Sequence, residues 1–170
     1  MEYEVIELGG GENPLYRPNL DITLFKAVDI VCDLTKGIPL PDSSVGKIYS
    51  QDFLEHLSFR DCLHLLGECN RILRKGGEIE FITPDIEKTL FTHSSFNEHV
   101  HHMVVGDDYI FRCKNWNEGR PELRHRMWFS PDLITYILTK EGWLNIIISE
   151  YRKDPDYWKE PKMRVVARKP

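Results

Sequence analysis

The run Tyr3-Glu4-Val5-Ile6-Glu7-Leu8-Gly9-Gly10-Gly11 joins a largely apolar segment directly to three glycines. An apolar run of this length that stops at turn residues is typical of a buried β-strand, here residues 3–8. Glycine adopts the positive φ angle of a tight turn and lets a ligand approach the backbone closely. The run therefore predicts a strand, a tight turn and a ligand site at the carboxyl end of that strand.

The residues after the glycines leave almost no room for a helix. A dinucleotide-binding fingerprint needs G-x-G-x-x-G at the start of a helix, but Glu12, Asn13 and Pro14 follow here, with Pro18 close behind. We expect the helix after the first strand to be shortened or missing, which disfavours a phosphate cradle at a helix N-terminus. A nicotinamide-dependent oxidoreductase is disfavoured for the same reason.

Strand and helix patterns alternate along the rest of the chain, which predicts an α/β sheet with helices on its faces. The polar segment with Pro155 and Pro161 is too short for a parallel crossover, so we expect the last strand to be antiparallel. The expected fold is a three-layer sheet of about seven strands. These strands are residues 3–8, 20–22, 27–32, 45–50, 78–83, 144–149 and 163–168.

Two helices have clear start and stop signals. Ser58 is a candidate N-cap with Asp61 as its capping-box partner, and Gly76-Gly77 is expected to end that helix. Ser130-Pro131 begins a second helix, which Gly142 ends. The positions that helical spacing predicts to face the core are Cys62, Leu65, Leu66, Cys69, Ile72, Leu73, Leu133, Ile134, Ile137 and Leu138.

Length and composition favour one globular domain, in which residues 85–129 form an irregular insert with no strong period. The 170 residues carry a net charge of -5, which disfavours non-specific binding to nucleic acid. No apolar run approaches the roughly 18 residues that a membrane span needs, and the acidic start is not a signal peptide. The four cysteines form no CxxC pair, so we expect reduced thiols and a cytoplasmic protein.

Two carboxylates follow successive strands. Asp21 ends the second strand and suits the two hydroxyls of a ribose, whereas Asp33 follows the third and suits the amino group of an adenine. Charge-assisted hydrogen bonds of this kind contribute about 1.5–3 kcal/mol each. A single carboxylate at a strand end is more often a cap or a solvated group. The order of glycine turn, Asp21 and Asp33 nevertheless favours a nucleoside site along one edge of the sheet.

At this point the chain resembles the class I S-adenosylmethionine-dependent methyltransferases, closely over residues 5–88 and loosely over 124–170. The resemblance includes the Glu-His signature of the family's small bacterial members and implies a Rossmann-like methyltransferase sheet. The segments that carry it are Glu7-x-Gly9-x-Gly11, Asp21, Asp33, Ile38-Pro39-Leu40-Pro41-Asp42-Ser43-Ser44-Val45 with Ile48-Tyr49-Ser50, Phe53-Leu54-Glu55-His56-Leu57, Glu68-x-x-Arg71-Ile72-Leu73-Arg74-Lys75-Gly76-Gly77 and Thr83-Pro84-Asp85.

The resemblance implies S-adenosylmethionine as cofactor, S-adenosylhomocysteine as product, and a small-molecule or glycan-precursor acceptor. His56 is the candidate catalytic base, with an orienting hydrogen bond inside the 50–56 loop as the alternative, and Glu55 is interpreted as structural. A non-catalytic domain that keeps the fold is the second hypothesis. The residues implied to bind the cofactor are Glu7, Leu8, Gly9, Gly10, Gly11, Asp21, Ile22, Asp33, Leu34, Ser50, Gln51 and His56.

The other histidines and the aromatic residues of the insert have weaker patterns. His93 and His125 are further base candidates, with an ordinary surface position as the alternative. His99, His101 and His102 suggest a metal site, but no further ligand stands at a defined spacing, so we expect no metal. The resemblance implies that the 85–129 insert is a lid that covers the active site and binds the acceptor, with a small core that packs this lid onto the sheet as the alternative. Six aromatic residues of the insert fit either role: Phe96, Tyr109, Phe111, Trp116, Trp128 and Phe129.

Overall fold

The structure is a computed structural model that describes residues 2–92, 125–153 and 161–170. Most of the expected insert, residues 93–124, therefore lies outside the described residues, and so does the fourth cysteine, Cys113. The predictions that fall on these residues concern His93, Phe96, His99, His101, His102, Tyr109, Phe111 and Trp116.

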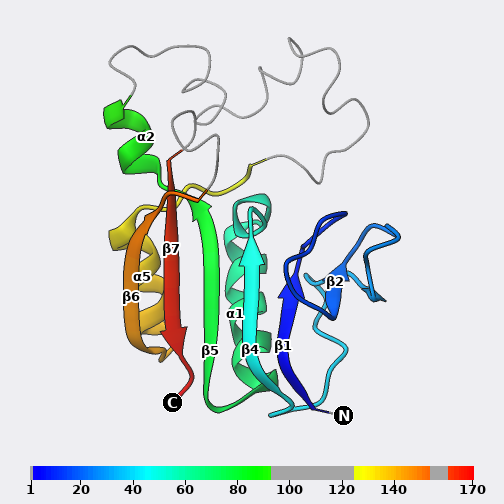
Figure 1. Cartoon of the computed structure of the whole chain (residues 1–170). Coiled ribbons are helices and arrows are strands. Elements are labelled where there is room, and N and C mark those ends of the chain that lie inside the picture. The colour runs from blue at the N-terminus through cyan, green and yellow to red at the C-terminus, as the bar shows by residue number, and fades with distance from the viewer. Residues whose placement is uncertain (1, 93–124, 154–160) are drawn as a thin grey trace.

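A seven-stranded sheet in the order β3-β2-β1-β4-β5-β7-β6 forms the centre of the molecule (Figure 1). Strands β1 to β5 run parallel to one another, and β7 runs antiparallel to both β5 and β6. The predicted seven strands and reversed last strand are confirmed. The strands are β1 Tyr3–Leu8, β2 Asn19–Asp21, β3 Ile30–Val31, β4 Val45–Gln51, β5 Leu73–Pro84, β6 Leu144–Tyr151 and β7 Lys162–Arg168.

The chain passes from β1 to β2 through turns without a helix, as the prolines predicted. β3 is shorter than predicted, because residues 25–29 form turns instead of extended strand. The backbone amide of Val28 donates to Phe25 O, and that of Asp29 donates to Asn19 O.

Helix α1, Phe59–Ile72, follows the short 3-10 helix η1, Leu54–His56. Ser58 caps α1 as predicted, since its hydroxyl accepts from Asp61 N at 3.2 Å. The predicted stop at Gly76-Gly77 is wrong, because Leu73 already pairs with Val45 and begins β5. Five of the predicted core positions on α1 are buried: Cys62, Leu65, Leu66, Cys69 and Ile72.

Helix α5, Pro131–Lys140, begins at Ser130, whose hydroxyl accepts from Leu133 N. It ends before Gly142, which has a φ of 80°. Leu133 is 36% exposed, so its predicted core position is wrong, whereas Ile134, Ile137 and Leu138 are buried as predicted. The short helix α2, Ile86–Thr92, leads into the insert.

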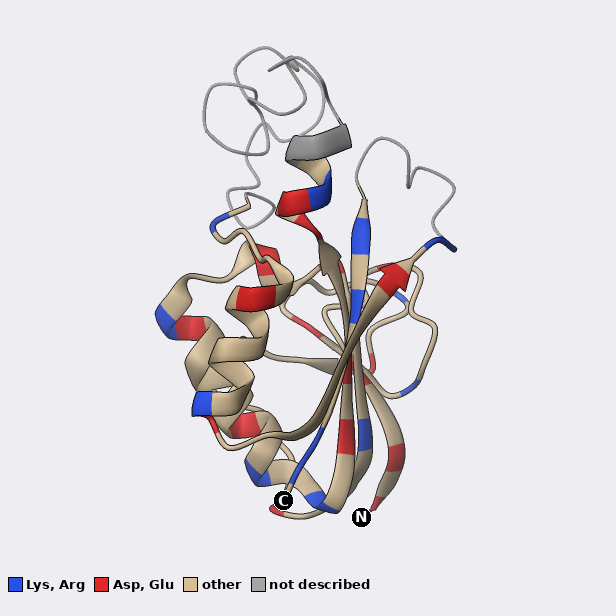
Figure 2. Ribbon diagram, turned by 90° about the vertical axis from the view of Figure 1, so that its left-hand side faces the viewer, with Lys and Arg blue, Asp and Glu red and all other residues tan. Residues whose placement is uncertain are grey.

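Helices α1 and α5 pack on the same face of the sheet (Figure 2). Of the three expected layers, the described residues supply the sheet and this one helical layer. The main hydrophobic core lies between them and includes Ile48, Phe81 and Val165 from the strands and Leu65 and Ile137 from the helices. None of the described helices has the length and apolar character needed to cross a membrane.

Candidate functional site

Side chains from the neighbouring strand, rather than a helix, hold the glycine turn after β1. Asn19 is fully buried, and its Oδ1 accepts from Gly10 N while its Nδ2 donates to Gly11 O and to Ala27 O. Asp21 Oδ2 accepts from Gly11 N at 3.1 Å. These bonds satisfy backbone groups that a following helix would otherwise engage, and they fix the turn against β2. Sequence reasoning missed Asn19, because nothing in the local pattern separates it from a surface asparagine.

Gly9 and Gly11 each suit their position in the turn for a different structural reason. Gly9 has a φ of 69°, and a Cβ built on it would lie 2.5 Å from Phe53 Cγ, so a side chain here meets both strain and a clash. Gly11 has a φ of 54° and open space around its Cβ position. Gly9 therefore packs the turn onto the loop after β4, whereas Gly11 leaves backbone accessible from outside.

The two predicted acids lie at the carboxyl ends of β2 and β3 and are partly engaged by their own loops. Asp21 Oδ1 accepts from Thr23 N at 2.8 Å. Asp33 accepts from the Thr35 hydroxyl at 2.6 Å and pairs with Lys36 at 3.1 Å. The Thr35 hydrogen bond, together with Lys36, lowers the pKa of Asp33 against a smaller opposing effect of burial. Asp33 is therefore ionised near neutral pH, as a hydrogen-bond acceptor for a ligand needs to be.

One cavity of about 250 Å³ brings together the glycine turn, both acids and His56, and we call it the Asp21–Asp33 cavity. Its walls come from the loops after β1, β2, β3 and β4 and from Arg126. The carboxyl ends of these parallel strands form one edge of the sheet (Figure 1). The residues that line it are Gly9, Gly11, Asp21, Ile22, Thr23, Phe25, Cys32, Asp33, Leu34, Thr35, Asp52, Phe53, His56, Leu57 and Arg126. The spatial convergence that the sequence order predicted is therefore present.

The other candidate cofactor residues lie elsewhere. Glu7, Gly10 and Gln51 line a second cavity of about 390 Å³, which we call the Glu7 cavity and which shares Gly9 and Asp52 with the first. The last two candidates, Leu8 and Ser50, line neither cavity, because both are buried in the sheet. The Ser50 hydroxyl donates to the carbonyl oxygen of Leu8 at 2.8 Å.

Glu7 acts on the segment that replaces the missing helix. Its carboxylate accepts from Tyr16 N at 2.7 Å, and the Tyr16 ring packs edge-on against Tyr49 at 5.1 Å between centroids. Burial raises the pKa of Glu7, although backbone amides of residues 15 and 16 oppose that effect. The described contacts therefore give Glu7 a positioning role for the 9–18 segment.

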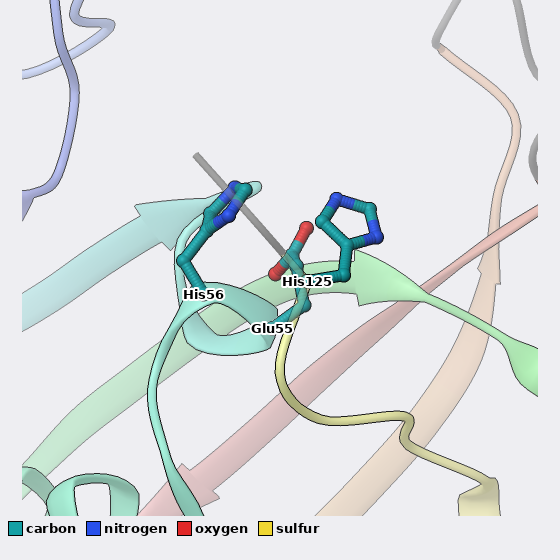
Figure 3. Close-up of side chains that lie close together, drawn as sticks. All are labelled: Glu55, His56 and His125. Atoms are coloured by element: carbon teal, nitrogen blue, oxygen red, sulfur yellow. The ribbon is translucent and has the colours of Figure 1, made fainter. Parts of the chain in front are cut away.

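Glu55, His56 and His125 form a cluster beside the Asp21–Asp33 cavity, with their side chains pointing toward one another (Figure 3). Glu55 is 1% exposed and its Oε2 accepts from the Thr83 hydroxyl at 3.1 Å. The His56 and His125 rings meet edge to face at 4.9 Å between centroids. The Glu55-His56 pair was visible in the sequence, but the approach of His125 from a distant segment was not.

The Glu68-x-x-Arg71 motif serves the fold rather than the cavity. Arg71 bonds both carboxylate oxygens of Glu68 and donates to the carbonyl oxygens of Ile38 and Leu40 and to Asp42. The Arg71 guanidinium lowers the pKa of Glu68 to about 2, more than burial raises it. This clamp fixes the segment before β4 against α1.

Comparison with known proteins agrees with this architecture. Residues 16–81 match the family model described as "Methyltransferase domain". No curated protein matches the sequence of the chain.

Among solved structures, the chain is similar to a methyltransferase of Thermotoga maritima described as a possible histamine N-methyltransferase, with a TM-score of 0.68 and 17% identity over 98% of this chain and 82% of that one. An Archaeoglobus fulgidus methyltransferase gives a TM-score of 0.64 and 14% identity over 99% and 86% of the two chains. Phosphoethanolamine N-methyltransferase 2 of Haemonchus contortus, solved with S-adenosylmethionine, gives 0.64 and 13% identity. All of this chain aligns there, but it spans only half the length of that protein.

The sheet order with its reversed last strand and the similar solved structures define the fold: the chain has the Rossmann-like fold of the class I S-adenosylmethionine-dependent methyltransferases, and residues 16–81 match the model of a methyltransferase domain. Within that fold, this chain has no helix after β1, and Asn19 and Glu7 hold the turn between β1 and β2 instead.

Proposed function

We propose that the chain catalyses methyl transfer from S-adenosylmethionine, with the nucleoside part of the cofactor in the Asp21–Asp33 cavity. The observation that carries the proposal is the convergence of the Gly9–Gly11 turn, Asp21 and Asp33 on that single cavity. In an open α/β sheet, ligands bind beyond the carboxyl ends of the strands, and the cavity lies at that edge.

The residues of the cavity fit this ligand. Each oxygen of Asp21 accepts one backbone amide, and a carboxylate has about four acceptor positions, so capacity remains for two ribose hydroxyls. Asp33 is ionised and suits an adenine amino group. The open backbone at Gly11 lets the remainder of the cofactor pass close to the turn.

The cofactor, when bound, supplies a methyl group already activated by the positive sulfur, so the protein supplies alignment and exclusion of water. We propose a small-molecule or glycan-precursor acceptor that enters beside η1, where His56 and Arg126 line the cavity. The similar structures from Haemonchus contortus and Thermotoga maritima carry names of small amine acceptors, which supports this class of acceptor. His56 lines the cavity on this side and is the candidate residue for the proton of the acceptor.

A calorimetric titration with S-adenosylhomocysteine tests the proposal. Asp21→Asn removes a charged acceptor and is expected to weaken binding by about 10–100-fold, because a hydrogen bond to a charged group contributes about 1.5–3 kcal/mol. Asp132→Asn, in the exposed first turn of α5, is the matched control and should bind like the wild type. At 100 times the dissociation constant, the ligand should add about 2.7 kcal/mol to the wild-type stability.

Two results would contradict the proposal in different ways. Equal affinity in Asp21→Asn and the wild type would place the ligand elsewhere. Binding without consumption of labelled S-adenosylmethionine in any acceptor extract would favour the non-catalytic alternative, to which the missing helix after β1 lends support.

A further inference from the structure

We propose that Glu55, His56 and His125 bind a divalent transition-metal ion in the wall of the Asp21–Asp33 cavity. Each residue offers one ligand atom, and these three atoms lie within 4.8 Å of one another. Two imidazoles and one carboxylate are a ligand set that suits zinc, iron or manganese ions. The sequence alone indicated no metal, because His125 is far along the chain from the Glu55-His56 pair.

The backbone fixes the approach of His125 to this pair. The amides of Arg126 and Met127 both donate to the carbonyl oxygen of Glu55, at 2.6 and 3.1 Å. Two bonds to one carbonyl oxygen bring the 125–127 segment against η1, so His125 does not depend on its side chain alone for its position. The cluster is therefore built by two segments that are tied together beneath it.

The carboxylate has the support that ligands of a metal need. Glu55 is almost completely buried, and the Thr83 hydroxyl on β5 binds its Oε2 and so orients the carboxyl group. Burial makes a carboxylate favour a positive charge beside it, which a divalent ion supplies. Two ligand atoms that each bind one ion at about 2.0–2.2 Å lie at most about 4.4 Å apart, so the ligand atoms of this cluster would move closer together when an ion binds.

The position of the cluster indicates a catalytic kind of site. His56 and Arg126 line the cavity, so an ion held by three protein ligands would keep an open position toward it. The role of the ion rests on the proposed function: the open position suits an acceptor whose hydroxyl oxygen binds the ion and loses its proton more readily. The oxygen would then form the bond to the methyl carbon, the carbon–sulfur bond would break with its electron pair on sulfur, and the proton would pass to solvent. In the metal-bound form His56 would thus be a ligand of the ion, and the ion would take over its role toward the acceptor proton.

Titration of chelator-treated full-length protein with Co²⁺, Zn²⁺ and Mn²⁺ tests the site. We expect one equivalent of Co²⁺ with the visible absorption that imidazole ligation gives. His56→Asn and His125→Asn should each abolish that absorption. His64→Asn, an exposed histidine on α1, is the matched control and should keep it. Thr83→Val, which keeps all three ligands, should weaken binding by about 10–100-fold.

Metal uptake with the same affinity in His56→Asn, His125→Asn and the wild type, or no uptake by the wild type, would overturn the site. Melting curves show whether each variant is folded. If a histidine variant does not fold, Thr83→Val still tests the site, because it keeps all three ligands. Titration of the same samples with S-adenosylhomocysteine separates the two proposals. Nucleoside binding without metal uptake overturns only the metal site, and metal uptake without nucleoside binding overturns only the proposed function.

Discussion

On the face of the sheet under α1 and α5, the strands present Ile48, Ile79 and Val165, which belong to the main core. On the opposite face, the neighbouring positions of the same strands present Lys47 and Glu80 to one another. Among the described residues, no helix covers this second face (Figure 2). The two faces therefore differ in chemistry from one residue to the next along each strand.

The difference explains how the chain can lack a helix after β1. A helix on a sheet is needed to bury an apolar face. The uncovered face instead carries a network in which Glu80 pairs with Lys47 and Arg164, and Glu78 pairs with Lys47 and Arg168. Burial raises the pKa of Glu80, but its bonds to Arg164 and Lys47 together lower the pKa by more than burial raises it, so the net shift is downward. Within the described part of the chain, charge pairing on this face takes the place of the packing that a helix would provide.

The largest effect is expected from two matched substitutions on β5. Ile79 is fully buried within the main core, whereas Ile82 is 1% exposed but points to the opposite face and lies outside that core. Ile79→Ala should lower the free energy of unfolding by about 3–5 kcal/mol through lost burial and a cavity. Ile82→Ala should cost about 2 kcal/mol, because fewer apolar neighbours surround the lost atoms.

Urea unfolding of both variants at neutral pH measures the difference. Equal costs would show that the second face holds an apolar core of its own, and the comparison between the faces would then be wrong. Unchanged m-values in both variants would show that the loss lies in the native contacts.

The second prediction concerns charge at the rim of the helix-covered face. Arg71→Met removes the clamp between α1 and the segment before β4, and leaves Glu68 partly buried without its partner. We expect a loss of about 2–3 kcal/mol, below that of Ile79→Ala. The Glu68 and Arg71 side chains are 19% and 32% exposed, so solvent weakens this pair only in part.

The same clamp predicts a pH dependence. Because the pKa of Glu68 falls from 4.5 to about 2 on folding, its contribution is complete above the unfolded value and is lost as the pH falls toward about 2. Glu68→Gln should therefore be less stable than the wild type at neutral pH, and the gap should narrow at about pH 3. A gap that stays constant on acidification would contradict the origin of the effect in this carboxylate.

Much of this fold could be predicted from the sequence, because strand positions follow from apolar runs and turn residues. The end of α1 could not, since pairing of Leu73 with Val45 is a tertiary contact that overrides the glycine signal at Gly76-Gly77. The sequence also distinguishes the two faces of the sheet, of which the described helices α1 and α5 cover one (Figure 2). Lys47-Ile48 and Glu78-Ile79-Glu80-Phe81 alternate between charged and apolar residues, which indicates two chemically different faces.

Part of the candidate site could likewise be predicted from the sequence, and part could not. Gly9, Asp21 and Asp33 follow successive strands, so parallel pairing alone brings them to one edge, and their convergence could be predicted. Asn19 holds the turn through buried hydrogen bonds that no local pattern indicates. His125 reaches Glu55 only through the return of the chain after the insert, and sequence spacing carries no information about that return.

The smallest effect is expected on the charged face, where Lys47→Met removes one cation from the network. Glu80 keeps Arg164 and Glu78 keeps Arg168, so no carboxylate loses its last partner. The Lys47 side chain is 30% exposed, and pairs that water and salt reach contribute about 1 kcal/mol or less. The cost should shrink further as salt is added, because mobile ions screen the remaining charges.

Lys75→Met, at an exposed position of β5, is the control for loss of one positive charge and should leave the stability almost unchanged at every salt concentration. Urea unfolding at low and high salt measures both variants. A salt-independent cost in Lys47→Met as large as that of Ile79→Ala would mean that Lys47 contributes through packing of its aliphatic part. The second face would then depend on buried apolar contacts as the helix-covered face does, and charge pairing would not explain why none of the described helices covers it.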